Sequence, residues 1–355
     1  MAGQLKQYAF INAKLRARIS KILPDEIINQ MIRARTLAES IQLLKGTSFT
    51  LIETTYSRTG DLKMAELELF KQEVSLYLEL ERYLRGDVLN FVRALASRYE
   101  IDNLKNVLRL WFDHSIRGRS IEEPLGYLYH SAIHYDLQID KIINARDIGE
   151  LQVVLKGTPY SSLISRNAEQ VREQMSVFPF EIALDHFYYQ QLLERAEKLQ
   201  PSDYKIVKRF IGVEIDMQNI NWLIRFKNFY NLSLEETLKY IIPQGYNVDM
   251  DKIEEAYNSP NITDMFSELI RKRYGSFSTI LTSQKSDRSA RLILIERILE
   301  QIILYEIRHV MAGYPFTIGI ILAYFILKGN EIKKIMTILN AKLYKLPEDR
   351  IKATL

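Results

Sequence analysis

The sequence predicts an all-α protein built from three similar helical units, and three observations carry this prediction. The chain has 355 residues, of which only 14 are Gly and 9 are Pro, while residues that favour helices dominate. Apolar residues recur at helical spacing. The helical patterns themselves recur at fixed intervals along the chain, which is the signature of repeated structural units. Apolar residues make up 47% of the chain, enough to bury sizeable cores.

A pentapeptide in the first part of the chain returns almost unchanged in the second. Residues 43–47 read LLKGT and residues 154–158 read VLKGT, and the matches extend over residues 32–49 and 143–160 at one offset, 143 − 32 = 111. A phosphate-binding Walker A loop places Gly before Lys after a long glycine-rich cradle, so these copies do not match it. We interpret each copy as a helix stop with its Gly in the left-handed conformation.

A second motif, Asn-Φ-x-x-Φ-Φ-Arg with Φ apolar, occupies residues 103–109 and 219–225, at an offset of 219 − 103 = 116. Residues 331–337 keep its apolar spacing at an offset of 331 − 103 = 228, but both polar ends differ, and Thr337 replaces the Arg. A weak third copy of the pentapeptide's flank falls at residues 274–277. The motif therefore indicates three copies, the last one degenerate.

An apolar stripe upstream of this motif shifts with it. Its first copy is Leu67, Phe70, Val74, Tyr77, Glu81 and Leu84. Its second copy is Ile182, Asp185, Tyr189, Leu192, Ala196 and Leu199. Its third copy is Ile295, Ile298, Ile302, Tyr305, His309 and Ala312. Together the patterns predict three units near residues 1–118, 119–231 and 232–355.

Equivalent positions before the motif are Asp87, Asp203 and Pro315, residue types that begin helices at the N-cap or first position. Residues 310–327 contain no charged side chain. Gly313 and Pro315 interrupt this stretch, and residues 315–327 align with charged helices of the other units, so we interpret residues 315–327 as a repeat helix and not as a membrane span. The missing charge predicts that this helix is either enclosed or faces an apolar partner.

Composition and missing motifs narrow the classes of function that the protein could have. The net charge of +4, from 48 basic and 44 acidic residues, does not indicate nucleic-acid binding, and the absence of Cys excludes disulfides and thiolate chemistry. The amino terminus does not resemble a secretory signal. Motifs typical of hydrolases, zinc proteases and dinucleotide-binding enzymes are missing. We therefore assign no catalytic, metal or cofactor-binding residue and expect a binding or structural role.

Several polar residues are candidates for a functional site. His130 and His134 have the spacing of a metal chelate on one helical face, but no third ligand accompanies them. His309 lies on the predicted core stripe, where an interior or groove histidine is favoured over a catalytic base. Glu122–Glu123 and Asp249–Asp251 are expected to be solvated or to cap helices. Arg109 and Arg225 recur at one motif position, for which a structural role is favoured over a partner surface.

Several segments of the sequence resemble those of a known protein family. The sequence YAFINAKLRAR at residues 8–18, the two Asn motifs, and Pro315–Phe316 followed by Asn330–Glu331–Ile332 are similar to the C-subunit of A-type and prokaryotic V-type ATP synthases, whose eukaryotic counterpart is the d-subunit of the vacuolar ATPase. The resemblance covers the chain from Tyr8 to about residue 344. It transfers no contact residue, because the family's contacts do not form a motif that maps onto this sequence.

The resemblance implies a fold and a role. Three similar all-α domains would form a funnel with a pseudo-three-fold arrangement and a central cavity. The protein would be a non-catalytic rotor subunit, peripheral on the cytoplasmic face of the membrane. It would link the central stalk, made of a coiled-coil subunit and its companion, to the proteolipid ring. It would transmit torque for coupled ATP synthesis or hydrolysis and proton or sodium transport, without cofactor, nucleic acid or direct nucleotide binding.

Two other functions stay open at this point. A soluble helical-repeat adaptor could bind a peptide or coiled coil in a groove without any link to a membrane ring. A metal hydrolase using His130 and His134 would require stoichiometric bound metal.

Overall fold

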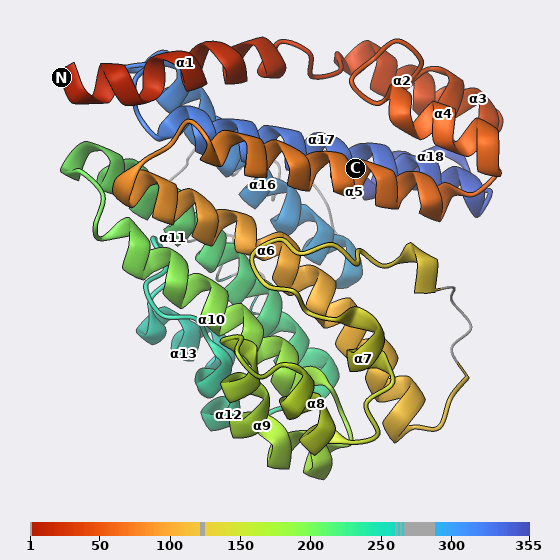
Figure 1. Cartoon of the computed structure of the whole chain (residues 1–355), viewed down its shortest axis with the longest axis vertical. Coiled ribbons are helices and arrows are strands. Elements are labelled where there is room, and N and C mark those ends of the chain that lie inside the picture. The colour runs from red at the N-terminus through yellow and green to blue at the C-terminus, as the bar shows by residue number, and fades with distance from the viewer. Residues whose placement is uncertain (1, 121–124, 260–261, 263–264, 266–287) are drawn as a thin grey trace. The chain divides into compact units, whose positions relative to one another are not determined.

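A computed structural model describes residues 2–120, 125–259, 262, 265 and 288–355 of the chain (Figure 1). In these residues the backbone forms helices joined by turns and loops, with no β-strand, so the predicted all-α class is confirmed. The division into three similar units with a pseudo-three-fold arrangement stays a prediction. The weak third copy of the pentapeptide's flank, at residues 274–277, lies outside the described residues.

Three pairs of long helices follow one another along the chain. They are α5 (Leu62–Glu81) with α6 (Gly86–Trp111), α10 (Phe178–Ala196) with α11 (Pro201–Arg225), and α16 (Arg288–Ala312) with α17 (Gly319–Leu343). The shorter helices are α1 (Ala2–Ile19), α2 (Asp25–Arg33), α3 (Leu37–Gln42), α4 (Thr50–Thr59), α7 (Ile139–Ile143), α8 (Ile148–Val154), α9 (Tyr160–Gln174), α12 (Leu234–Tyr240), α13 (Met250–Asn258) and α18 (Glu348–Thr354). One π-helical turn follows α6 at Phe112–Ile116, and another follows α11 at Phe226–Tyr230.

The contacts divide the chain into two compact units, residues 44–198 and residues 1–43 with 199–355. In the unit of residues 44–198, α6 packs against α10, α5 and α7. The predicted apolar stripe is confirmed in both of its copies here. Its buried members are Leu67, Val74, Tyr77 and Leu84, and Ile182, Tyr189, Leu192 and Ala196.

The repeated pentapeptide forms a similar turn in both places. Gly46 and Gly157 have φ angles of +76° and +89°, in the left-handed region that Gly adopts without strain. The hydroxyl groups of Thr47 and Thr158 donate to the carbonyl three residues earlier, at 2.6 and 2.8 Å. Because α3 and α8 end directly before these turns, the helix-stop interpretation is confirmed.

In the unit of residues 1–43 and 199–355, α17 is the central element. Helix α1 lies along it (Figure 1), and α2, α3, α11, α16 and α18 also contact it. The central part of the uncharged segment, residues 317–324, is buried here, and this enclosure explains why that part lacks charge, whereas residues 312–314 are exposed. None of the helices in the described ranges has the length and apolarity that crossing a membrane requires.

The predicted helix starts need correction. Asp87 and Asp203 lie inside the first turns of α6 and α11 and are not N-caps, and Pro315 precedes α17, which begins only at Gly319. Asp203 is buried because it has another task. Its carboxylate accepts hydrogen bonds from the hydroxyl of Tyr8 at 2.7 Å and from the N–H of Ile318 at 3.0 Å, at the start of α17.

The third copy of the stripe, on α16, is only partly as predicted. Ile302 is buried, but Tyr305 is 45% exposed. The buried positions beside Ile302 are Ile303, Glu306 and Ile307. Glu306 explains this orientation, because its buried carboxylate pairs with Arg209 of α11 at 2.6 Å, and a buried carboxylate must face its partner.

A close approach between α11 and the loop after α12 gives the first prediction. A Cβ at Gly212 would lie 2.7 Å from Cβ of Tyr246 and 3.0 Å from its backbone N. We expect Gly212→Ala to lower the free energy of unfolding by about 1–3 kcal/mol, because the backbone has to move. Urea unfolding measures the change.

Gly329→Ala is the matched control, since Gly329 also lies inside a long helix and a Cβ there would meet nothing within 4 Å. This variant should be neutral or more stable by up to about 1 kcal/mol, the helix propensity gain of Ala over Gly. Equal effects of the two substitutions would contradict the close-approach argument.

Candidate functional site

The Asn that opens the repeated motif holds a loop in both complete copies. Asn103 of α6 donates its side-chain N–H to the carbonyl of Tyr129 at 2.8 Å and accepts from the N–H of the same residue at 3.4 Å. Asn219 of α11 does the same to Ile242, at 2.8 and 2.9 Å. A side-chain amide carries a donor and an acceptor side by side, so it satisfies both backbone groups of one residue.

An acidic residue one turn before each Asn holds the loop at a second point. Glu100 accepts from the backbone N–H groups of His134 and Tyr135 at 2.7 and 2.8 Å. Asp216 accepts from those of Asn247 and Val248 at 2.7 and 3.0 Å. Helices α6 and α11 therefore each hold the loop that follows at two places, five or six residues apart, and we call each such acid–Asn pair a loop clamp.

Sequence reasoning missed these acidic residues. Glu100 and Asp216 share the offset of the Asn motif, 216 − 100 = 116, and each lies among apolar residues on the buried face of its helix. A charged residue at the same buried position of two repeats was the signal that could have identified them. Glu100 also accepts a hydrogen bond from the hydroxyl of Tyr160 at 2.7 Å, and burial raises the pKa of that phenol above its ordinary value.

A third contact ties the end of each long helix to the short helix beyond the loop. The indole N–H of Trp111 donates to the carbonyl of Ala145, just after α7, at 2.8 Å. The ammonium group of Lys227 donates to the carbonyl of Ser259 at 2.8 Å and to that of Tyr257, at the end of α13. A cation at a helix C-terminus is also favoured by the helix dipole.

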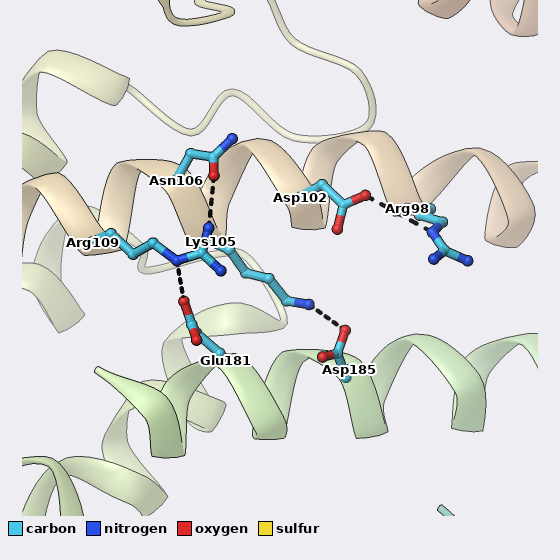
Figure 2. A network of polar contacts seen from close by, with 7 residues as sticks. All are labelled: Arg98, Asp102, Lys105, Asn106, Arg109, Glu181 and Asp185. Atoms are coloured by element: carbon cyan, nitrogen blue, oxygen red, sulfur yellow. Dashed lines mark hydrogen bonds and ion pairs between the residues drawn. The ribbon is translucent and has the colours of Figure 1, made fainter. Parts of the chain in front are cut away.

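Figure 2 shows a row of polar contacts that joins α6 to α10. Lys105 pairs with Asp185, and Arg109 pairs with Glu181. Burial raises the pKa of Asp185, and the ammonium group of Lys105 opposes that rise. The Lys105–Asp185 pair is the more enclosed, with side chains 12% and 20% exposed.

The two motif arginines do not share one contact. Arg109 bridges to Glu181 and to Asn106, the latter at 3.0 Å, so its predicted structural role is confirmed. Arg225 is exposed and forms no ion pair with any residue the structure describes. The shared position therefore does not define a common binding residue.

The histidine pair does not lie on a helix. His130 and His134 belong to the loop that Asn103 and Glu100 hold, so the predicted helical face is wrong. Nδ1 of His130 lies 3.8 Å from a carboxylate oxygen of Asp140. Over the described part of the chain, no three His, Asp or Glu residues gather in a way that could hold a metal ion.

The other candidates have mixed outcomes. His309 is exposed and stacks on Tyr305, with ring centroids 5.8 Å apart, so the predicted interior position is wrong. The rotation of α16 toward Arg209 explains the difference. Asp249 caps α13 as predicted, accepting from the N–H of Lys252 at 3.0 Å. Glu122–Glu123 lies outside the described residues.

These side chains act on the protein's own backbone. The contacts of Asn103, Glu100 and Trp111, and the matching contacts after α11, all join a side chain to backbone groups of a loop or short helix. The hydrogen bonds of these side chains are therefore made within the protein. They form a helical scaffold in which side chains of the long helices hold the loops that follow.

The sequence profile of the ATP synthase (C/AC39) subunit family matches residues 11–354, so the chain belongs to this family. The resemblance inferred from the sequence is thereby confirmed.

Three curated relatives share a name. The chain is similar to the C-subunit of the A-type ATP synthase of Methanosphaera stadtmanae, with 26% identity over 352 residues that cover 98% of this chain and 87% of that relative. It is 23% identical to the same subunit of Methanocaldococcus jannaschii, covering 100% and 88% of the two chains. The subunit of Thermococcus gammatolerans is 26% identical, covering 92% and 84%.

The second prediction concerns the loop clamp. Asn103→Ala leaves the buried N–H and C=O of Tyr129 without a partner, so we expect it to lower the free energy of unfolding by about 2–4 kcal/mol. Asn106→Ala is the matched control, one turn further on the exposed side of the same helix, and it should cost about 0.5 kcal/mol or less. Urea unfolding separates the two, and similar losses would show that Asn103 is not a clamp.

The third prediction concerns Asp216. Burial raises the pKa of its carboxyl group from 3.8 to about 6, against the backbone N–H groups that lower it. The folded state therefore binds this proton more tightly than the unfolded state. The resulting stabilisation is fully present below about pH 4 and is lost as the pH rises to about 6, by up to about 3 kcal/mol.

Asp216→Asn cannot titrate, so the difference in unfolding free energy between wild type and variant should change across this pH range. Urea unfolding at pH 4, 5, 6 and 7 tests it. A difference that stays constant from pH 4 to pH 7 would show that Asp216 keeps an ordinary pKa.

Proposed function

We propose that this chain is the C-subunit of an A-type ATP synthase and works as a non-catalytic rotor part. In this role it links the central-stalk subunits to the membrane proteolipid ring, on the cytoplasmic face and peripheral to the membrane. It transmits torque for coupled ATP synthesis or hydrolysis and ion transport. The observation that carries the proposal is the family match over residues 11–354, supported by relatives of one name that align over nearly the whole chain.

The loop clamps fit a part that carries mechanical load. Torque passes between bodies only while their shapes hold, and loops are ordinarily the softest segments of a helical protein. Here the loops after α6 and α11 are held at two buried points each. The enclosed Lys105–Asp185 pair also joins α6 to α10 and opposes sliding between these two close-packed helices.

The fourth prediction uses a reconstituted complex. Omitting the chain should leave ATP hydrolysis by the soluble head intact while ATP-driven ion pumping falls to background, because the connection between stalk and ring is missing. Adding back the purified chain should restore pumping. Hydrolysis is measured by phosphate release and pumping by a fluorescent indicator in vesicles.

Two variants refine the test. Asn103→Ala should reduce the number of ions pumped per ATP, since a softened loop transmits less torque. Arg109→Ala removes only a partly exposed ion pair, which is worth about 1 kcal/mol or less, and should pump normally. A complex that pumps with normal coupling without the chain would refute the rotor role and favour the free helical-repeat adaptor.

A further inference from the structure

Helix α17 has its own version of the loop-holding pair. Lys328 and Glu331 stand at the positions of Glu100 and Asn103, at one offset, 328 − 100 = 228 and 331 − 103 = 228. One carboxylate oxygen of Glu331 accepts from the backbone N–H of Leu23 at 2.6 Å. The residue held by α17 therefore lies near the other end of the chain, 308 positions away.

The changed residue types fit this contact. The side chains of Lys328 and Glu331 are 9% and 4% exposed and pair at 2.9 Å. A carboxylate can only accept, so Glu331 holds the N–H of Leu23 with one oxygen and the ammonium group with the other. The two substitutions belong together, because either charge alone would be buried without compensation. The third copy of the motif is altered in chemistry but keeps its task.

The end-of-helix contact is present as well. Lys342 donates to the carbonyls of Ile32 and Ala34 at 2.6 and 2.5 Å, at the end of α2. Lys227 makes the same pair of contacts at the end of α13, again to carbonyls two residues apart. Both α2 and α13 have nine residues.

The pentapeptide repeat identifies the held segment independently. Its offset of 111 aligns Ala34 with Ala145, since 145 − 34 = 111. Ala145 is the residue whose carbonyl Trp111 holds after α6. A sequence match and a hydrogen bond thus assign Ala34 to the place that Ala145 has in the neighbouring repeat.

We infer that α17 carries a binding site for the chain's own residues 20–34, here called the closing segment, and that this segment completes the third repeat. It takes the place that the loop and short helix after α6 and α11 take in the other copies. Lys328, Glu331 and Lys342 form the polar part of the site. Leu23, Met31 and Ile32 of the closing segment are buried, so the segment also makes apolar contacts. The inference does not rest on the proposed rotor role.

The fifth prediction compares two double variants of the full chain, Lys328→Met with Glu331→Leu and Lys328→Met with Glu331→Asn. Both remove the buried charges, and they differ only in whether residue 331 can hold a backbone group. Hydrogen exchange, followed by mass spectrometry, is measured for peptides covering residues 20–34, 127–145 and 242–259. The last peptide belongs to the same compact unit and serves as the internal reference.

With Leu at position 331, exchange in residues 20–34 should rise by roughly tenfold or more, as loss of a buried charge-assisted hydrogen bond implies. With Asn, the residue of the other two copies, exchange should stay within about threefold of wild type. Unchanged exchange with Leu, equal increases in all three peptides, or no advantage of Asn over Leu would overturn the inference.

Lys342→Met keeps the test independent of residues 328 and 331 should the double variants fail to fold. It should raise exchange in residues 30–36 by roughly tenfold, because the last carbonyls of α2 lose their donor. Lys334→Met is the matched control on the same helix and should leave these residues unchanged. No difference between the two lysine variants would remove Lys342 from the site.

Discussion

Backbone groups in the buried parts of loops must find hydrogen-bond partners, and the rest of this structure depends on how α6 and α11 meet that need. A buried N–H or C=O without a partner costs about 1–3 kcal/mol. Helices cannot supply backbone partners from their middle turns, so side chains have to do it. An acid and an Asn three residues apart point the same way from a helix. Each pair therefore reaches two points of one loop.

Repetition made most of this fold predictable from the sequence. The all-α class, the helix stops at Gly46 and Gly157 and the stripes of α5 and α10 all follow from patterns that depend on the side chains alone. The purpose of Asn103 and Asn219 did not follow, because their partners are backbone groups, which leave no trace in the sequence. The helical face predicted for His130 and His134 was wrong for the same reason, because the hydrogen bonds that hold their loop leave no trace in the sequence. Their helical spacing is accidental in a segment whose backbone is held open by α6.

Where buried charged residues form pairs, the buried face of a helix differs from the one that its apolar pattern predicts. On α16 the stripe predicts that Tyr305 and His309 face inward, but the buried pair of Glu306 with Arg209 turns the neighbouring face to α11. A buried carboxylate without its partner costs more than exposing two aromatic rings. On α17, Lys328 and Glu331 replace the acid and the neutral amide of the other copies. They are buried as a pair within one turn, so each charge compensates the other. The sequence pattern predicts a degenerate copy, whereas in the structure Glu331 of this copy still accepts a hydrogen bond from a backbone N–H, that of Leu23.

The place of residues 20–34 also matters for how the protein is made. Leu23 leaves the ribosome long before Glu331, which follows 308 residues later. At about 5–20 residues per second this interval lasts roughly 15–60 s. Throughout it residues 25–33 are without their place on α17, and an isolated helix of nine residues is marginal in water, so Met31 and Ile32 stay available to other apolar surfaces. We therefore expect synthesis rate and chaperone capture of the amino-terminal segment to affect the yield of folded protein.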